Sequence, residues 1–276
     1  MGLFGSSDDK KRQPAGSANG GQFAPDTSGK TPPESDPLRI VRYTPNGGAM
    51  ERSASGVDAA HAAYQASLSE DERLIALTDD ELHTRAVTAA ARGAQTFAAE
   101  MVELRKIAKL KADDEYDRSK NFEDDTNTWR PYRIPMNDID LSGMQLEGVD
   151  FSNAELHRAK FDNATLTNCK FDNAVLVSSS FVGTTLTSGN FYGAQLSKSD
   201  FTTCFGDGVS FERTGMNEVK FHGSQLRYCD FRSASLREAL MESVTLTGSN
   251  LDGARMAGAR IVPARYADTN GTPNWS

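Results

Sequence analysis

Residues 159–176 read AKFDNATLTNCKFDNAVL, and the four residues that begin at Phe161 return ten residues later at Phe171. Leu166 and Leu176 continue the series, so that a large apolar residue occurs at every fifth position. A helix repeats its buried face about every 3.6 residues and a strand every two, so neither element explains this spacing. The stretch therefore predicts a repeating structure whose unit has five residues.

The five-residue period continues without a change of register from Met136 to Ile261, with a break only at Gly206. A small or β-branched residue, such as Ala154 or Cys169, usually lies two positions before each large one. The remaining three positions of each unit are mostly polar or charged. Each unit of five therefore has two regularly placed positions, one large and apolar and one small.

This pattern resembles the pentapeptide-repeat family over residues 134–266. The resemblance implies an all-β right-handed quadrilateral β-helix, a solenoid in which four pentapeptides form one turn. Residues twenty apart would then stack, with neighbouring turns about 4.8 Å apart. Phe161 and Phe171 would belong to opposite columns and would not touch each other.

The rest of the chain divides by composition. Residues 1–56 are rich in Gly, Ser and Pro and lack apolar periodicity, which predicts a disordered or partner-ordered tail. Residues 57–120 predict an α-helical segment, 121–133 a connection and N-terminal cap, and 267–276 a C-terminal tail.

The helical segment carries its own signals. Thr78 and Glu81 have capping-box spacing, and an apolar stripe from Leu82 to Ala108 predicts one long amphipathic helix. This helix would pack against its own chain, pair with another copy or lie on a partner. In the connection that follows, Trp129 and Tyr132 are expected to cover the first exposed layer of the β-helix.

The stretch Arg12–Pro25, RQPAGSANGGQFAP, contains a Gly-Gly turn and one aromatic residue, Phe23. It resembles a short motif of actinobacterial and actinophage proteins. The two readings of this stretch are a flexible linker and a docking peptide anchored by Phe23.

No group of residues predicts chemistry. Cys169, Cys204 and Cys229 fall on small inward positions and are interpreted as core. The four histidines lack metal-ligand spacing and are interpreted as solvated surface, and no serine lies in a nucleophile motif. We therefore expect no catalytic residue, metal or cofactor, and no enzyme.

The charges predict a ladder, because opposite signs are often twenty residues apart. Examples are Asp200 and Lys220, Asp207 and Arg227, and Glu212 and Arg232. Residues 134–266 contain 15 acidic and 12 basic residues, so imitation of DNA by an acidic face, the functional alternative, would be weak. The net charge of −8 argues against direct nucleic-acid binding, and the sequence lacks an apolar run of about 20 residues that would span a membrane.

The break at Gly206 leaves two interpretations of the preceding Phe205. The main interpretation is a packing defect with local repair, in which Phe205 turns inward. In the alternative, Phe205 stays outside as a contact residue. Gly206 and Gly208 would also permit a bulge.

The family includes bacterial proteins that protect DNA gyrase from quinolones by presenting a DNA-sized, negatively charged rod. This sequence departs from them in its nearly balanced charges, its lack of loop insertions and the absence of a helix after Tyr266. The main hypothesis is therefore a non-enzymatic structural or protein-interaction module, whose rigid β-helix is attached through its N-terminal tail and helix to a larger assembly.

A phage particle is the concrete version, with capsid or tail proteins as partners and this chain as a minor capsid or accessory component. The alternative is a DNA-mimic regulator or protector of a type II topoisomerase, DNA gyrase. The expected location is the bacterial cytoplasm or a virion. The candidate partner contacts are Phe23, Phe205, Trp129 and Tyr132; the oligomeric state is not predicted.

Overall fold

The computed structural model describes residues 63, 66–119, 131–261, 269 and 271–274. The predictions for residues 1–56, including Phe23, and the prediction for Trp129 lie outside the described residues. The helices and the β-helix belong to one compact unit.

Three helices precede the β-helix: α2 (Glu70–Ile75), α3 (Asp79–Ala91) and α4 (Ala94–Ser119). Ser69 begins α2 and Thr78 begins α3, each with a complete capping box in which the N-cap and a glutamate three residues later satisfy each other's backbone. The capping box expected at Thr78 is thus present.

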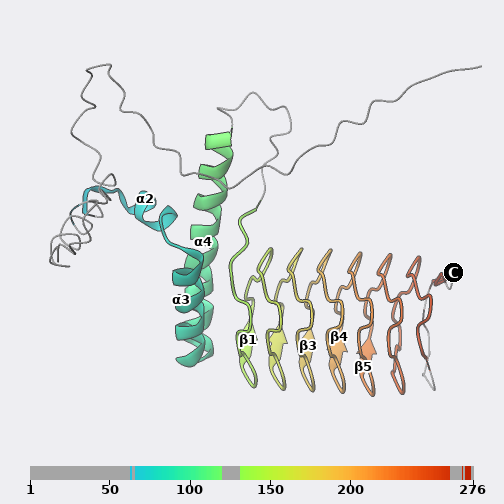
Figure 1. The fold of residues 1–276 in the computed structure, drawn as a ribbon. Coiled ribbons are helices and arrows are strands. Elements are labelled where there is room, and N and C mark those ends of the chain that lie inside the picture. Colours follow the sequence, from blue (N-terminus) through green and yellow to red (C-terminus); the bar gives the residue numbers. More distant parts are fainter. Residues whose placement is uncertain (1–62, 64–65, 120–130, 262–268, 270, 275–276) are drawn as a thin grey trace, which may run out of the picture. The chain divides into compact units, whose positions relative to one another are not determined.

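The prediction of one long helix is wrong, because α3 ends at Ala91 and α4 begins at Ala94. Between them Gly93 has φ of 101°, a conformation that stops a helix and that glycine adopts at low cost. The apolar stripe therefore folds back on itself, and α3 and α4 lie side by side (Figure 1). An ion pair between Arg85 Nε and Glu100 Oε1, 2.6 Å apart, joins the two helices.

Five short strands lie on one face of the β-helix: β1 (Gln145–Glu147), β2 (Thr165–Thr167), β3 (Thr185–Thr187), β4 (Phe205–Asp207) and β5 (Gln225–Arg227). They form a parallel sheet in the order β1-β2-β3-β4-β5, and each residue pairs with the residue twenty positions later (Figure 1). Isolated bridges repeat the same register on the other faces, as between Asp140 and Lys160. The predicted right-handed quadrilateral β-helix is confirmed, and the break at Gly206 leaves its register unchanged.

The corners of the β-helix have a shared backbone conformation. Every fifth residue from Asp138 to Gly258 has a positive φ, and sixteen of these residues are not glycine. This left-handed region is easiest for Gly and tolerable for Asn, which explains why Gly and Asn often lie two positions after a large apolar residue. The five-residue unit is thus two inward positions, two outward positions and one left-handed corner.

Phenylalanine columns fill much of the interior. The rings of Phe171 and Phe191 stack with centroids 4.5 Å apart and planes 3° apart. The expectation that Phe161 and Phe171 do not touch is wrong, since their rings meet edge to face at 5.6 Å. The interior is so narrow that rings from opposite columns contact each other.

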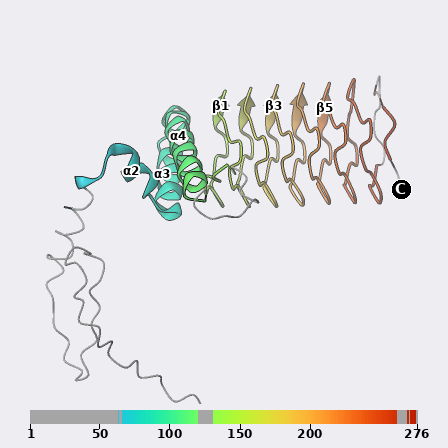
Figure 2. The same ribbon diagram turned by 90° about the horizontal axis from the view of Figure 1, so that it is seen from above.

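The helices close the first turn of this core. Phe97 of α4 is fully buried and stacks on Phe151 with ring centroids 5.9 Å apart. Figure 2 shows α3 and α4 across the end of the β-helix where β1 lies. Of the three alternatives for the helical stripe, packing against its own chain is the one that the structure contains.

The last described residues also join the β-helix. The backbone of Asn274 donates to Ala254 O at 2.7 Å and accepts from Met256 N at 2.7 Å. Asn274 therefore pairs with the final turn, within the segment that the sequence predicts as a tail.

Candidate interaction surface

The interior of the described β-helix is filled and its polar groups are satisfied. Ser179 Oγ donates to Leu176 O at 2.6 Å, and Thr184 Oγ1 donates to Phe161 O at 2.6 Å. Among the described residues no buried side-chain nitrogen or oxygen lacks a partner, and no three His, Cys, Asp or Glu residues are grouped as metal ligands would be. The candidate interaction residues of this part of the chain therefore lie on its outer surface.

The three cysteines are buried as free thiols. Burial raises the pKa of Cys169 to about 11 and that of Cys229 to about 12, and it also raises the pKa of Cys204. A thiol that stays protonated is a poor nucleophile and a poor metal ligand. All three are core residues.

The vacancy at Gly206 is filled from the following turn. A Cβ at this position would lie 2.9 Å from Leu226 Cδ2, 3.5 Å from Cys229 Sγ and 3.6 Å from Val209 Cγ2. Gly206 pairs in register with its neighbours, so there is no bulge. The main sequence interpretation is wrong in one respect: local repair occurs, but Phe205 does not supply it.

Phe205 instead faces outward from β4 and is half-buried. The guanidinium carbon of Arg227, in β5, lies 5.6 Å from the centroid of the Phe205 ring. The predicted ion pair between Arg227 and Asp207 is absent from the described contacts, because the arginine lies over the aromatic ring rather than directly over the carboxylate. Stacking restricts the guanidinium while leaving its donors in the plane available.

Tyr228 follows Arg227 at a corner and is 68% exposed. Its φ is 52°, a conformation that costs a bulky residue about 1–2 kcal/mol. The other described residues at this corner of the β-helix are Gly, Asn or Ser, namely Gly148, Asn168, Ser188, Gly208 and Gly248. The ring lies over Gly248, where an added Cβ would be 2.5 Å from Tyr228 Cδ1.

The β1–β5 face around these residues has few charges. Its outward positions are mainly threonine and glutamine, and its charged residues are Glu147, Asp207 and Arg227. We call Phe205, Arg227 and Tyr228, with the surrounding outward residues of β3 to β5, the β4–β5 surface.

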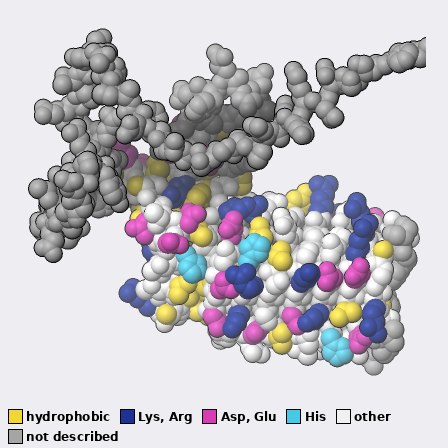
Figure 3. All heavy atoms as spheres, in the orientation of Figure 1, with side chains coloured by type: hydrophobic (Ala, Val, Ile, Leu, Met, Phe, Trp, Pro, Cys, Tyr) yellow, Lys and Arg dark blue, Asp and Glu magenta, His cyan; other side chains and the backbone are white. Residues whose placement is uncertain are grey.

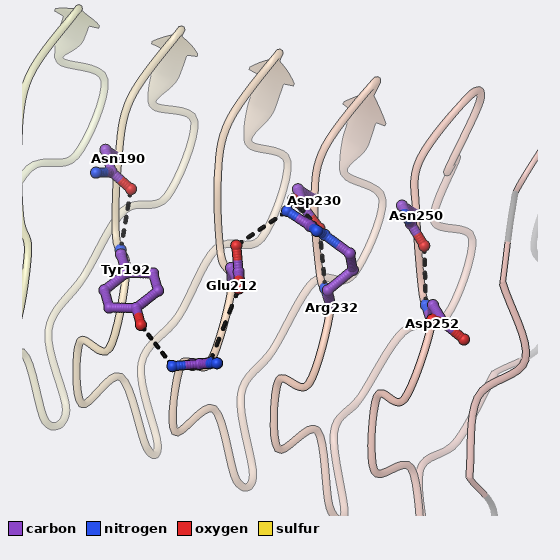
Figure 4. A network of polar contacts seen from close by, with 8 residues as sticks. Asn190, Tyr192, Glu212, Asp230, Arg232, Asn250 and Asp252 are labelled. Atoms are coloured by element: carbon purple, nitrogen blue, oxygen red, sulfur yellow. Dashed lines mark hydrogen bonds and ion pairs between the residues drawn. The ribbon is translucent and has the colours of Figure 1, made fainter.

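The neighbouring face differs, because its polar side chains satisfy one another (Figure 4). Arg213 Nη1 donates to Tyr192 Oη at 2.7 Å, and Arg213 Nε lies 3.8 Å from Glu212 Oε1. Glu212 Oε2 also accepts from Arg232 at 3.0 Å, and Arg232 pairs with Asp230 at 2.7 Å. These residues form a ladder that joins three successive turns.

The predicted charge ladder is therefore confirmed in part. Glu212 pairs with Arg232, and Lys220 Nζ lies 3.4 Å from Asp200 Oδ2. On the side of the molecule that Figure 3 shows, acidic and basic side chains are interspersed along the β-helix. This arrangement contrasts with a surface of a single sign.

Tyr132 joins the helices to the β-helix. Its hydroxyl donates to Asp79 at the start of α3, and Lys111 of α4 lies 5.2 Å from its ring centroid. Burial, together with the hydrogen bond to Asp79, raises the pKa of the Tyr132 hydroxyl. Tyr132 is half-buried and packs against the common core, while Trp129 lies outside the described residues.

One histidine differs from its expected role. His83 is half-buried, and its Nε2 lies 2.9 Å from Asn137 O in the first turn of the β-helix. The interpretation of His83 as solvated surface is therefore wrong, since it helps to hold α3 against that turn.

Sequence reasoning found Phe205 but missed Arg227 and Tyr228. The signal for Tyr228 was present, because a bulky aromatic at a corner position departs from the Gly, Asn and Ser of the same corner. The stacking of Arg227 on Phe205 could not be predicted in this way, because it depends on contacts between two turns.

None of the helices in the described part of the chain combines the length and the apolar composition of a membrane span.

Comparison with known proteins gave two family matches, both within the β-helix. Residues 136–173 match a model for pentapeptide repeats, and residues 177–256 match a model for a pentapeptide repeat region. No curated protein matched the chain significantly.

Several solved structures are similar to the chain. A trypsin-treated variant of QnrB1, described as a plasmid-mediated fluoroquinolone resistance protein, is 20% identical, with a TM-score of 0.25; the match covers 48% of this chain and 67% of that one. HetL from Nostoc sp. strain PCC 7120, described as a pentapeptide repeat protein involved in heterocyst differentiation regulation, is 17% identical, with a TM-score of 0.23 and coverages of 58% and 93%. A pentapeptide repeat protein from the Arabidopsis thaliana thylakoid lumen is 21% identical, with a TM-score of 0.23 and coverages of 45% and 68%.

Both family matches lie inside the observed β-helix, and each describes the residues that it covers as pentapeptide repeats.

Proposed function

We propose that the chain is a non-enzymatic protein-interaction module whose β-helix docks on a partner protein through the β4–β5 surface. The observation that carries this proposal is the outward stack of Arg227 on Phe205 beside the exposed ring of Tyr228. Aromatic residues and arginine are enriched among the residues that dominate binding energy at protein interfaces.

Arg227 is suited to bind a partner because its guanidinium is held in place by Phe205 and has no ion pair among the described residues. The described residues provide no ion pair for its guanidinium, whereas Arg213 and Arg232 on the neighbouring face are paired. Because the ring of Phe205 already restricts the side chain, less conformational entropy is lost when a partner binds it. A carboxylate or backbone carbonyl of the partner would accept from the free donors.

Tyr228 supports the same proposal through its exposed ring. Its left-handed backbone is shared by the other corner residues of the β-helix, but its ring is 68% exposed and does not fill the core. Tyrosine is enriched among the residues that dominate binding energy at protein interfaces. The flat, nearly uncharged sheet beside it allows close approach of a second protein.

The N-terminal region is proposed to attach the β-helix to a larger assembly. The Arg12–Pro25 motif supports a phage particle as that assembly, with capsid or tail proteins as partners and with Phe23 and Trp129 as further contacts. Limited proteolysis of the free and the assembled protein tests this attachment, and equal cleavage of residues 1–56 in both states would contradict it.

Affinity capture from cells of the native source tests docking through the β4–β5 surface. Wild-type protein is compared with the triple variant Phe205→Ala, Arg227→Ala and Tyr228→Ala. We expect proteins retained by the wild type to be lost from the variant, while the urea midpoint of the variant remains high enough for it to be folded during capture.

A matched control changes three outward residues on another face: Thr202→Ala, Lys220→Ala and His222→Ala. This control is expected to retain the same proteins as the wild type. Equal retention by all three proteins would overturn docking through the β4–β5 surface.

Regulation or protection of DNA gyrase is the second proposal. The excess of acidic over basic residues in 134–266, 15 against 12, supports it, but the pairing of Asp200 and Glu212 with cations weakens the negative surface that a DNA mimic needs. A gyrase supercoiling assay with the full chain decides it, and no effect at micromolar protein would remove this proposal.

A further inference from the structure

A groove runs along α4 where the helix meets residues 131–132 after the connection. Its cavity volume is about 440 Å³. Ala108 and Ala112 of α4 form part of its floor and are almost completely buried, and Tyr132 lines it from the opposite side. The volume falls within the range of about 300–1,000 Å³ that ligand pockets usually have.

The charged residues that line this groove are all cationic. They are Arg105, Lys106 and Lys109, and no acidic side chain is among the lining residues. Arg105 is fixed at one end, because it lies 3.4 Å from Asp150 Oδ2 and donates to Ser152 O.

Lys106 and Lys109 have no ion pair among the described residues, and they are three positions apart, which places them on the same side of α4. Val102, one turn before Lys106, is 67% exposed and lies on the same side of α4 as the two lysines. The groove therefore combines an apolar floor with two cations that the described residues leave without an ion pair.

We propose that this groove binds an acidic segment of a partner protein, with an apolar side chain of that segment inserted between α4 and Tyr132. Carboxylates of the segment would pair with Lys106 and Lys109, while the apolar side chain would contact Ala108 and Ala112. Complementary charge supplies specificity and speeds association, whereas burial of the apolar side chain supplies affinity.

Fluorescence anisotropy with the full chain tests this inference. The probe is a short labelled peptide of aspartate, glutamate and leucine, compared with one in which Asn and Gln replace the acids and one in which Ser replaces the leucines. We expect the first peptide to bind wild-type protein and both matched peptides to bind about tenfold more weakly or not at all. Binding should also weaken as salt is raised, because the cations are near solvent.

The protein variant Lys106→Glu with Lys109→Glu should weaken binding of the acidic peptide by about tenfold or more. Its charge-matched control is Arg237→Glu with Arg255→Glu, at the other end of the β-helix, which should bind as the wild type does. Equal binding by wild type and the Lys106 and Lys109 variant would overturn the inference, and so would equal binding of the neutral peptide.

The chain itself contains an acidic stretch near the groove in sequence, Glu123, Asp124 and Asp125. The variant Glu123→Gln with Asp124→Asn and Asp125→Asn tests whether this stretch of the chain itself occupies the groove. Peptide binding that occurs only in this variant would assign the groove to the chain's own segment and overturn a partner site. The groove is separate from the β4–β5 surface, so the capture experiment above and this titration fail independently.

Discussion

The rings of Phe161 and Phe171, ten residues apart in sequence, meet edge to face inside the β-helix, with centroids 5.6 Å apart and planes 83° apart. Each ring also stacks within its own column, Phe161 on Phe181 at 4.6 Å and Phe171 on Phe191 at 4.5 Å. The two columns therefore form a single aromatic core, in which each interior ring is held from above, from below and from the opposite side.

Phe191→Ala is expected to lower the free energy of unfolding by about 3–5 kcal/mol, the usual cost for a buried aromatic residue. Phe191 is fully buried, stacks on Phe171 and Phe211, and meets Phe181 and Phe201 edge to face. Urea unfolding followed by circular dichroism measures the loss. Thr165→Ala, at an exposed outward position, is the control and should change the value by less than about 0.5 kcal/mol. If Phe191→Ala lowers the free energy of unfolding by less than about 1 kcal/mol, the result would contradict a single aromatic core formed by both columns.

Phe97→Ala is expected to loosen the first turn while leaving the later turns unchanged. Phe97 covers Phe151, and its removal leaves a cavity between α4 and the end of the aromatic column. Because turns of a solenoid contact only their neighbours, the effect should decline along the array. Hydrogen exchange measured by mass spectrometry should increase in α4 and in residues 141–161, with little change beyond residue 220.

The control for Phe97 is Val102→Ala on the exposed side of the same helix. It should leave exchange in the first turn unaltered. Uniformly faster exchange over the whole β-helix in the Phe97 variant would show that the helices are not a local cap.

The period of the sequence was sufficient to predict the β-helix and its register, because a spacing of five residues repeated over many units permits few regular structures. Pairing of Leu166 with Leu186 twenty residues later follows directly from four units per turn. The helix break depends on Gly93 and the unusual corner on Tyr228. Each feature rests on a single residue, so the apolar period does not predict it.

Other features depend on contacts that a local pattern does not contain. The filling of the Gly206 vacancy by Leu226 and the path of Arg227 over Phe205 are both set by the adjacent turn. The groove beside α4 requires the helix to lie near residues 131–132, a placement that the helical stripe alone left open among three alternatives. Thus the core was predictable, whereas the two candidate interaction surfaces mostly were not.

Tyr228→Gly is expected to be more stable than Tyr228→Ala by about 1 kcal/mol, because φ at this corner is 52° and only glycine adopts it without a Cβ penalty. Both variants lose the same ring contact with Gly248, so their difference isolates the backbone term. The same pair at Thr165, inside β2, should show the opposite order, with glycine less stable by about 0.5–1 kcal/mol. Urea unfolding of the four variants measures both differences, and an alanine variant as stable as glycine at position 228 would contradict the strain.

Stability should fall as pH rises above about 8.5, through the buried thiols. Burial raises the folded-state pKa of Cys169 to about 11 and of Cys229 to about 12, whereas an unfolded cysteine has a pKa of about 8.5. Between these values the folded chain keeps the protons and the unfolded chain releases them, so each rise in pH favours unfolding. The limiting slope is about 1.4 kcal/mol per pH unit for each thiol, and the contribution is fully present below pH 8.5.

Urea unfolding in a reducing buffer at pH 7.5, 9 and 10 measures this slope for the wild type and for Cys169→Ala with Cys229→Ala. Lysine and tyrosine titrations occur in both proteins, so the difference reports the two thiols; an identical pH dependence would contradict their burial in the folded chain.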